Sequence, residues 1–298
     1  MSQTASVKVP ASSANLGPGF DVLALALDLH LEVRARESST TRISWHGEGV
    51  HEVPLDDRNL LLRAAQEPFT GWARPLSGID LHVQNAIPVG RGLGSSAAAL
   101  VAGITLGARL RGLRMTAQRV IELAFPFEGH GDNLGAALHG GFCIAAIENG
   151  GVRVHHLAWP QRWRAVVFVP ESLSPTHEAR RLVPTHPPRE AAVFNLGRVA
   201  EWVLAVTNQD RSLLQTAMDD RLHQPGRAQA YPYLDDMIAA AEQAGALGAA
   251  LSGAGGSVIA IADRSLKPVA DAMDKQARQR GLPGRIFALA AATRGTRL

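Results

Sequence analysis

The sequence predicts an α+β fold, and three patterns support this. Residues 22–33 alternate strictly, with leucine at every second position from Leu23 to Leu31, as in a half-buried strand. An alanine-rich stretch at residues 97–110 is typical of a long helix. Asn149-Gly150 separates two apolar runs and is a hairpin signal. Strands with interspersed helices and hairpins favour an α+β sandwich over a Rossmann fold.

The N-terminal half contains most of the predicted strands. Besides residues 22–33, strands are expected at residues 41–45, 79–83, 141–147 and 152–157. The strand at residues 41–45 is interpreted as the antiparallel partner of residues 22–33. Helices are expected at residues 57–65, 97–110 and 116–125. Asp57 and Thr116 are the candidate N-caps of the first and last of these helices.

The C-terminal half has a different rhythm, with more helices and shorter strands. Strands are expected at residues 165–169, 249–251, 258–262 and 285–289. Helices are expected at residues 190–207, 211–218, 234–244 and 268–280. We place a domain boundary near residue 155, which gives an N-terminal domain of residues 1–155 and a C-terminal domain of residues 156–298.

Composition excludes several classes of protein. The formal charge of +3 is too small to indicate nucleic-acid binding by itself. The single cysteine, Cys143, stands in an apolar run, so neither a disulfide framework nor a cysteine-based zinc site is expected. The uncharged run at residues 243–262 is too weakly apolar and too rich in glycine to span a membrane. No signal peptide is evident, so a cytoplasmic protein without membrane or nucleic-acid partners is expected.

The strongest local feature is a glycine-rich string between a predicted strand and a predicted helix, Pro88-Val89-Gly90-Arg91-Gly92-Leu93-Gly94-Ser95-Ser96. Glycines let the backbone approach a ligand closely, and the N–H groups at the start of the helix favour an anion such as a triphosphate. Ser95 and Ser96 can donate to phosphate or bind Mg²⁺ through oxygen. No lysine follows the last glycine, so the string is not a Walker A motif.

Two further segments are dense in polar groups. Residues 10–21 include Asn15, which offers both a donor and an acceptor, and Asp21, which can hold an ammonium group. Residues 128–133 contain four functional side chains in six positions, Glu128, His130, Asp132 and Asn133. A carboxylate such as Glu128 can bind Mg²⁺, and the histidine and asparagine can orient a substrate hydroxyl or ammonium. For any one of these residues, ordinary turn chemistry or a structural histidine remains an alternative.

Together these strings resemble the motifs of homoserine kinases, a family of the GHMP kinase superfamily. The string from Pro10 to Asp21 resembles the first motif, with Ser12-Ser13 where many other GHMP kinases have a lysine. Pro88 to Ala98 resembles the second motif. The string Leu251-Ser252-Gly253-Ala254-Gly255-Gly256-Ser257 resembles the third. Residues 128–133 resemble the pattern Glu-Gly-His-Pro-Asp-Asn, with Gly131 in place of proline.

The resemblance implies the GHMP kinase fold, with an N-terminal domain like ribosomal protein S5 domain 2 and a ferredoxin-like C-terminal domain. It implies transfer of the ATP γ-phosphate to the hydroxyl of L-homoserine, in threonine biosynthesis, with ATP and Mg²⁺ bound in the cleft between the domains. The residues it assigns to ATP are Asn59, Pro88, Gly90, Arg91, Gly92, Leu93, Gly94, Ser95 and Ser96. Ser96 and Glu128 are assigned to the metal. A homodimer is also implied.

The residues assigned to the substrate come from both halves of the chain: Asn15, Asp21, His130, Asn133, Thr176, Arg180, Arg227 and Gly255. Arg180 and Arg227 are expected to clamp the carboxylate. Arg227 lies in a segment resembling His-x-Pro-Tyr-Arg, with Gly226 for the tyrosine. Related kinases carry an aspartate base where Asn133 stands, so direct attack by the substrate hydroxyl is expected, with Asp132 as an alternative base.

Three rival functions remain at this stage. A GHMP kinase for a different alcohol is disfavoured by Ser12-Ser13 and by Asn133. A non-catalytic sensor of ATP or a metabolite is disfavoured by the intact Ser96 and Glu128. A nucleic-acid function has no clustered basic stripe to support it. The exact amino-alcohol preference, feedback inhibition by threonine and the oligomeric state stay open.

Overall fold

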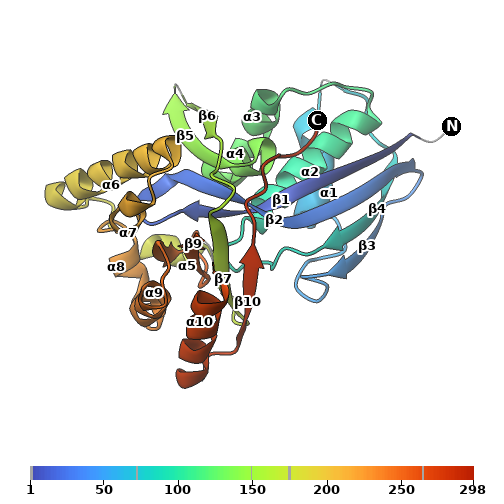
Figure 1. Ribbon diagram of the computed structural model, residues 1–298. Coiled ribbons are helices and arrows are strands. Elements are labelled where there is room, and N and C mark those ends of the chain that lie inside the picture. The colour runs from blue at the N-terminus through green and yellow to red at the C-terminus, as the bar shows by residue number, and fades with distance from the viewer. Residues whose placement is uncertain (1–2, 72, 149, 174–175, 264) are drawn as a thin grey trace.

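The computed structural model describes residues 3–71, 73–148, 150–173, 176–263 and 265–298, without the side chains of Thr176 and His177. Its described strands form two sheets. The first sheet comes from the N-terminal half and has the order β3-β4-β2-β5-β6, with β1 paired to β2. The second has the order β10-β7-β9-β8. Figure 1 shows the N-terminal helices α1 to α4 gathered on the first sheet, and α9 and α10 beside the second.

The bounds of the N-terminal elements are as follows: β1 (Thr4–Asn15), β2 (Gly19–Ser38), β3 (Arg42–Gly47), α1 (Leu60–Gln66), the 3₁₀ turn η1 (Glu67–Phe69), β4 (Gly78–Asn85), α2 (Ser95–Leu110), α3 (Ala117–Glu128), α4 (Asp132–His139), β5 (Phe142–Glu148) and β6 (Gly151–Leu157). The strand predicted at residues 22–33 is confirmed as the middle of β2. Thr116 is confirmed as the N-cap of α3, since its side chain accepts from the amide of Arg119.

The pairing predicted for residues 41–45 is wrong. These residues form most of β3, which pairs parallel with β4 and not antiparallel with β2. Both edges of β2 are already occupied, one by β1 and the other by β4 and β5. Residues 42–47 instead pair with the outer edge of β4. A parallel pair requires a crossover connection, which here contains α1 and η1.

The predicted cap of α1 is also wrong. The helix begins at Leu60, and its N-cap is Asn59 rather than Asp57. Asn59 Oδ1 accepts from the amides of Leu61 and Leu62 at 3.1 and 3.3 Å, and Nδ2 donates to the carbonyl of Pro54 at 2.7 Å. Asparagine and aspartate are nearly equivalent caps, so the sequence pattern alone could not choose between the two positions.

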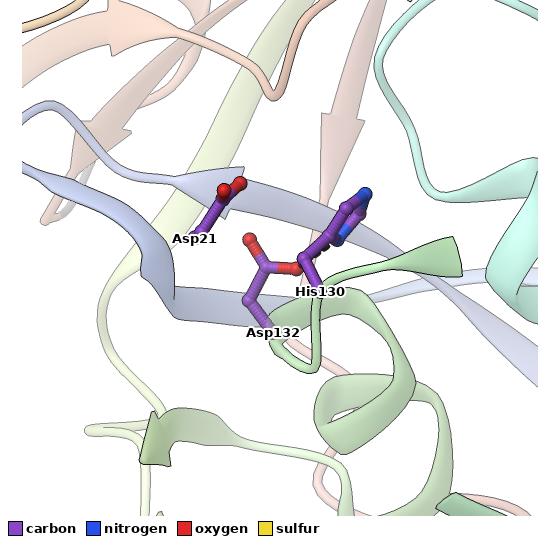
Figure 2. A group of neighbouring side chains, drawn as sticks. All are labelled: Asp21, His130 and Asp132. Carbon is purple, nitrogen blue, oxygen red and sulfur yellow. Dashed lines mark hydrogen bonds and ion pairs between the residues drawn. The ribbon is translucent and has the colours of Figure 1, made fainter. Parts of the chain in front are cut away.

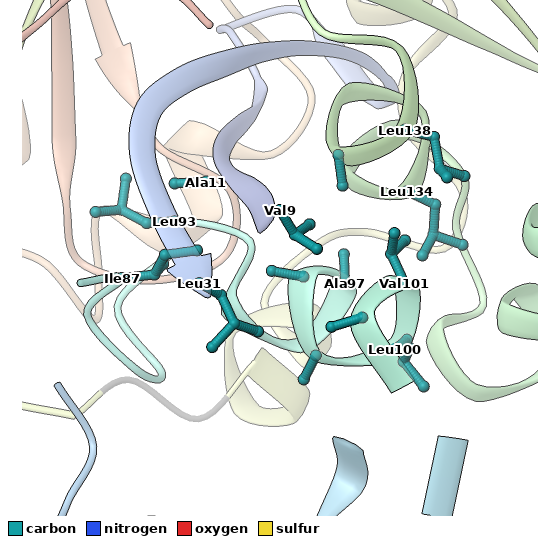
Figure 3. Packing of buried hydrophobic residues seen from close by; sticks show 14 of the residues in the cluster. Val9, Ala11, Leu31, Ile87, Leu93, Ala97, Leu100, Val101, Leu134 and Leu138 are labelled. Carbon is teal, nitrogen blue, oxygen red and sulfur yellow. The ribbon is translucent and has the colours of Figure 1, made fainter. Parts of the chain in front are cut away.

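Helix α2 is the centre of the N-terminal core, because most of its residues are buried. Figure 3 shows Ala97, Leu100 and Val101 of α2 facing Val9 of β1 and Leu134 at the start of α4. Two glycines bring α1 close to α2. A Cβ on Gly103 or on Gly107 would lie 2.3 Å from a backbone oxygen of α1. The small residues of α2 thus allow α1 and α2 to pack at short range.

The C-terminal elements are β7 (Arg164–Pro170), α5 (Thr176–Arg181), α6 (Arg189–Asn208), η2 (Arg211–Leu213), α7 (Leu214–Ala217), α8 (Gln224–Arg227), α9 (Leu234–Gln243), β8 (Gly248–Leu251), β9 (Val258–Ala262), α10 (Lys267–Gln279) and β10 (Gly284–Leu289). Numbered from β7, the sheet order is 4-1-3-2, with all neighbours antiparallel, which is the ferredoxin-like arrangement. Among the described residues, no helix is long and apolar enough to cross a membrane.

The C-terminal tail returns to the first sheet after β10 (Figure 1). The amide of Asp28 donates to the carbonyl of Ala290, and the amide of Ala292 donates to the carbonyl of Ala26. Thr296 bonds Ala137 of α4 through both its amide and its hydroxyl. A division into domains of residues 1–155 and 156–298 remains a proposal, and in it residues 290–298 would pack with the first domain.

Candidate active site

Loops that are far apart in the sequence meet beside the start of α2. The amide of Ser12, in β1, donates to the carbonyl of Leu93 at 3.1 Å. A Cβ on Gly92 would lie 2.1 Å from the carbonyl oxygen of Ser252, so this contact requires glycine. The first, second and third glycine-containing motifs therefore touch one another. Next to their junction lies a cavity of about 390 Å³.

Most of the predicted site residues line this one cavity. Those that line it are Asn15, Asp21, Asn59, Gly90, Gly92, Gly94, Ser95, Ser96, Glu128, His130, Asp132, Asn133, Arg180 and Arg227. They come from β1, β2 and the helices and loops of the N-terminal half, and from α5 and α8 of the C-terminal half. Residues that the sequence could group only by resemblance are thus brought together by the fold.

Five predicted site residues are not part of the cavity lining. Leu93 is buried in the core. Gly255 packs against the loop, because a Cβ there would lie 2.3 Å from the amide nitrogen of Gly92. Arg91 directs its guanidinium to three backbone oxygens, those of Val89, Pro170 and Glu171. The remaining two are Pro88 and Thr176, and the side chain of Thr176 lies outside the described part of the structure.

The N-terminus of α2 opens on the cavity. Its N-cap, Gly94, has a left-handed conformation with φ 68° and ψ 26°, and it offers no side-chain cap to the amides of the first turn. A Cβ on Gly94 would lie 2.1 Å from Ser12 Oγ, so a larger residue would displace the strand behind it. Uncapped amides at a helix N-terminus favour an anion, and Ser95 and Ser96 add hydroxyl donors there.

Glu128, at the end of α3, faces the same helix terminus. Its Oε1 accepts from Ser96 Oγ at 2.7 Å, and its side chain is only 9% exposed. Burial raises the pKa of Glu128, although the charge of His130 and the Ser96 hydrogen bond oppose the shift. The carboxylate and the serine hydroxyl form a pair of hard oxygen ligands, and the nearest cationic group, His130 Nε2, lies 3.6 Å from Glu128 Oε1. Glu128 and Ser96 therefore fit the Mg²⁺ ion of a nucleotide site.

Figure 2 shows Asp21, His130 and Asp132 converging on one point from β2 and from the start of α4. One ligand atom from each lies within 4.8 Å of the others. His130 Nδ1 contacts Asp132 Oδ1 at 2.7 Å. Burial lowers the pKa of His130, but the hydrogen bond and charge of Asp132, with the charge of Glu128, raise it overall. The two carboxylates make this end of the cavity suited to a cation such as an ammonium group.

Asn133 follows Asp132 in the first turn of α4 and is held on two sides. Its backbone amide donates to Asp132 Oδ1 at 2.7 Å. Its side-chain Oδ1 accepts from Ser12 Oγ at 2.8 Å. With the oxygen occupied, the amide nitrogen Nδ2 is the group left for a ligand in the cavity. Asn133 is thus arranged to donate a hydrogen bond to an oxygen, and not to remove a proton.

Arg180, on α5, forms a paired contact with Asp21. Nη2 lies 2.7 Å from Oδ1 and Nη1 lies 3.0 Å from Oδ2. Burial lowers the pKa of Arg180, but the hydrogen bond and charge of Asp21 raise it overall. From the sequence, Asp21 and Arg180 are expected to bind opposite charges of a ligand. The structure pairs them directly, across 159 positions of sequence.

Arg227, at the end of α8, is almost fully buried at 1% exposure. Its Nε donates to the carbonyl of Ala179 at 3.2 Å, and its Nη1 contacts the carbonyl of Gly253 at 2.9 Å and His223 Nδ1 at 3.1 Å. Burial, and then the charge of Arg180, lower the pKa of Arg227 to about 10. The guanidinium is fixed by groups of three separate segments.

His223 supports Arg227 from outside the cavity lining, and no role was expected for it from the sequence. It is fully buried, and its Nε2 lies 2.7 Å from the carbonyl oxygen of Gly17, which can only accept. Nε2 must then carry the proton, so Nδ1 is free to accept from Arg227. Burial lowers the pKa of His223 to about 4, which keeps it neutral at pH 7. The first motif and Arg227 are thereby linked through one imidazole.

The other end of the cavity is mainly apolar, and no motif marked it in the sequence. It includes Trp45, Val53, Pro54, Leu60, Leu61, Val89 and Ala99. Asn59 lies among them; its side-chain oxygen caps α1 and its side-chain nitrogen donates to the carbonyl of Pro54. An apolar wall next to an anion-binding helix terminus is a suitable surface for a nucleotide base. These residues are scattered through β3, a loop and two helices, so only the fold assembles them.

Gly226→Ala is expected to destabilise the protein by about 1–3 kcal/mol. A Cβ at this position would lie 2.0 Å from the backbone oxygen of Leu182, just after α5. The matched control is Gly197→Ala in α6, where a Cβ meets nothing within 4 Å. That variant is expected to gain up to about 1 kcal/mol. Urea unfolding of both variants measures the difference, and equal effects would contradict the close contact.

Three comparisons with known proteins agree. Residues 59–141 match the family model "GHMP kinases N terminal domain", and residues 203–279 match "GHMP kinases C terminal". A homoserine kinase of Moorella thermoacetica is 38% identical over 289 residues, which cover 97% of this chain and 98% of that protein. One from Leifsonia xyli is 42% identical over 265 residues, covering 87% and 81%.

Solved structures give the same result. The crystal structure of homoserine kinase from Cytophaga hutchinsonii has a TM-score of 0.89 and 28% identity, and the match covers 100% of this chain and 98% of that chain. L. major mevalonate kinase in complex with R-mevalonate has a TM-score of 0.71 at 20% identity, over 98% and 96% of the two chains, which indicates a shared fold only.

Proposed function

This chain belongs to the GHMP kinase family, and we propose that it acts as a homoserine kinase, transferring the γ-phosphate of ATP to the hydroxyl of L-homoserine. The predicted GHMP kinase fold is confirmed, as is the α+β class. One observation carries the choice of substrate. Beside an anion-binding helix terminus, the cavity lining places the carboxylate of Asp21 next to the guanidinium groups of Arg180 and Arg227. An α-amino acid offers the matching ammonium and carboxylate, whereas mevalonate has no ammonium.

The triphosphate is proposed to bind at the N-terminus of α2, with the base toward the apolar wall that contains Trp45. The open amides of the first turn and the hydroxyls of Ser95 and Ser96 would face its oxygens. Ser96 and Glu128 would hold Mg²⁺, whose chemistry is to neutralise the charge of the phosphates. The three glycines of the loop let its backbone reach them without a steric clash.

The reaction is proposed as direct attack of the homoserine hydroxyl on the γ-phosphorus. The new oxygen–phosphorus bond forms while the bond to the bridging oxygen breaks and leaves its electron pair on ADP. Asn133 Nδ2 would hold the attacking oxygen in line. Asp132 Oδ1 already accepts from the amide of Asn133 and contacts His130, so we assign Asp132 to positioning, and the hydroxyl proton passes to a phosphate oxygen. Positioning of this kind supplies much of phosphoryl-transfer catalysis.

Asn133→Leu is expected to lower kcat with L-homoserine by about 10²–10³-fold, because the donor to the reacting oxygen is lost. The assay couples ADP release to Mg-ATP and L-homoserine, beside L-serine, L-threonine and mevalonate. Asn208→Leu, at the exposed end of α6, is the control and keeps full activity. Turnover with another alcohol and none with L-homoserine would reject this substrate. ATP binding without turnover of any alcohol would favour a sensor.

A further inference from the structure

The ion pair between Asp21 and Arg180 sits in the wall of the cavity, and its two members face each other. The two contacts, at 2.7 and 3.0 Å, use both oxygens of Asp21 and both terminal nitrogens of Arg180. The side chains are 26% and 36% exposed, so the pair is reached by solvent but partly buried. A ligand that binds Asp21 or Arg180 on the edge that faces the other residue takes that residue's place.

Asp21 is held in place by its own backbone, so it is the less movable member of the pair. Its φ is 59°, an uncommon conformation for aspartate. Its amide donates to Asn15 Oδ1 at 3.0 Å, and Asn15 Nδ2 donates to the carbonyl of Gly253 at 3.0 Å. The backbone that carries the Asp21 carboxylate is thus held in place, while Arg180 reaches the carboxylate with a long side chain from α5.

The second guanidinium, Arg227, is not free to exchange partners. Its Nε and Nη1 are used by Ala179, Gly253 and His223, so in the described structure only Nη2 carries unused donors. Both guanidinium groups face the ring of Phe20, with centroid distances of 5.7 Å for Arg180 and 5.4 Å for Arg227. A carboxylate bound there would contact Arg227 through one nitrogen and would need Arg180 for its second oxygen.

We propose that Asp21 and Arg180 form a resting pair that a zwitterionic substrate exchanges for itself. The substrate ammonium takes the place of Arg180 on Asp21, and the substrate carboxylate takes the place of Asp21 on Arg180 and joins Arg227 Nη2. Neither charge of the protein is left without a partner. An alcohol that carries only one charge breaks the pair and leaves the other member unpaired, which is costly for a partly buried group.

This inference rests on the proposed function and adds to it that the ion pair between Asp21 and Arg180 is exchanged when the substrate binds. It differs from two independent subsites in one respect. With independent subsites, the losses on removing the ammonium and on removing the carboxylate are additive. With a resting pair, removing Asp21 favours an alcohol that carries only a carboxylate, because Arg180 no longer has to leave Asp21 to bind it. Removing Arg180 favours an alcohol that carries only an ammonium group, because Asp21 is then unpaired.

The decisive experiment compares Asp21→Asn and Arg180→Met with L-homoserine, 4-hydroxybutyrate and 3-aminopropan-1-ol. The second compound lacks the ammonium and the third lacks the carboxylate. Asp21→Asn is expected to lower kcat/KM for L-homoserine and to raise it about fivefold for 4-hydroxybutyrate, because Arg180 is then unpaired. Arg180→Met is expected to raise kcat/KM about fivefold for 3-aminopropan-1-ol.

The control is Arg36→Met, which removes an arginine from an ion pair with Asp80 on the first sheet, outside the cavity lining. It is expected to change none of the three values. If both site variants lose activity with every compound in the same proportion, the resting pair is overturned and Asp21 and Arg180 are separate subsites. If the unmodified protein does not phosphorylate L-homoserine, the proposed function fails. That outcome is distinct from failure of the resting pair, in which the unmodified protein is active.

Discussion

Glu128→Gln is expected to lower kcat by about 10²–10³-fold, the loss typical of removing one charged or polar group that stabilises a transition state. Glutamine keeps the shape of the side chain and can still accept from Ser96 Oγ, a contact of 2.7 Å in the structure. What it removes is the negative charge facing the N-terminus of α2. The KM for L-homoserine is expected to change little, because Glu128 makes no contact with Asp21 or Arg180.

The same substitution is expected to make the free protein more stable. Burial raises the pKa of Glu128 above its ordinary value of 4.5, so the folded protein holds this proton at a pH where the unfolded chain has released it. In that window the folded state binds more protons, and stability therefore falls as the pH rises. The cost develops as the pH rises through the raised pKa. Glutamine has no such cost, so the variant is expected to gain melting temperature relative to the unmodified protein as the pH rises, while activity is lost.

Differential scanning fluorimetry between pH 4 and pH 8, with and without Mg-ATP, measures both effects. Glu122→Gln, in the same helix but exposed and paired with Arg119, serves as the control and changes neither activity nor stability appreciably. Mg-ATP is expected to stabilise the unmodified protein more than the Glu128→Gln variant. A variant that is both less active and less stable would contradict the assignment of Glu128 to the metal.

Much of this fold follows from local patterns. The alternation of residues 22–33 defines the middle of β2, and Thr116 caps α3 as expected. The pairing of strands was harder to predict. Residues 41–45 have the pattern of a strand, but their partner is β4, which lies more than 30 positions further along the chain, and no local signal carries that information.

The site was predictable where it consists of contiguous strings and not where it consists of distant contacts. Helix α4 was missed because Asp132–His139 begins with a polar motif and contains Gly135. The helix forms there because it is almost entirely buried. The pair between Asp21 and Arg180 and the contact between His223 and Gly17 join residues 159 and 206 positions apart, which a pattern within one segment cannot reveal.

Arg227→Met is the second substitution with a large expected effect, because Arg227 serves both the fold and the substrate. Methionine fills a similar volume but removes the donor to the carbonyl oxygen of Ala179 and to Nδ1 of His223, whereas the carbonyl oxygen of Gly253 still accepts from Asn15 Nδ2. Two buried acceptors without this donor cost about 2–4 kcal/mol in total. Loss of the fixed cation is expected to lower kcat/KM for L-homoserine by about 10²–10³-fold, as for other hydrogen-bonded buried charges.

The two effects are separated by comparing substrates at a temperature where the variant is folded. A loss due to instability lowers the active fraction and reduces kcat alike with any substrate, leaving KM for ATP and L-homoserine unchanged. A lost carboxylate contact raises the KM for L-homoserine and leaves the KM for ATP unchanged. Arg221→Met, an exposed arginine stacked on Phe194 in the same segment, is the matched control. An unchanged KM for L-homoserine in Arg227→Met would exclude Arg227 from the site and leave it as a buried link between α8 and the third motif.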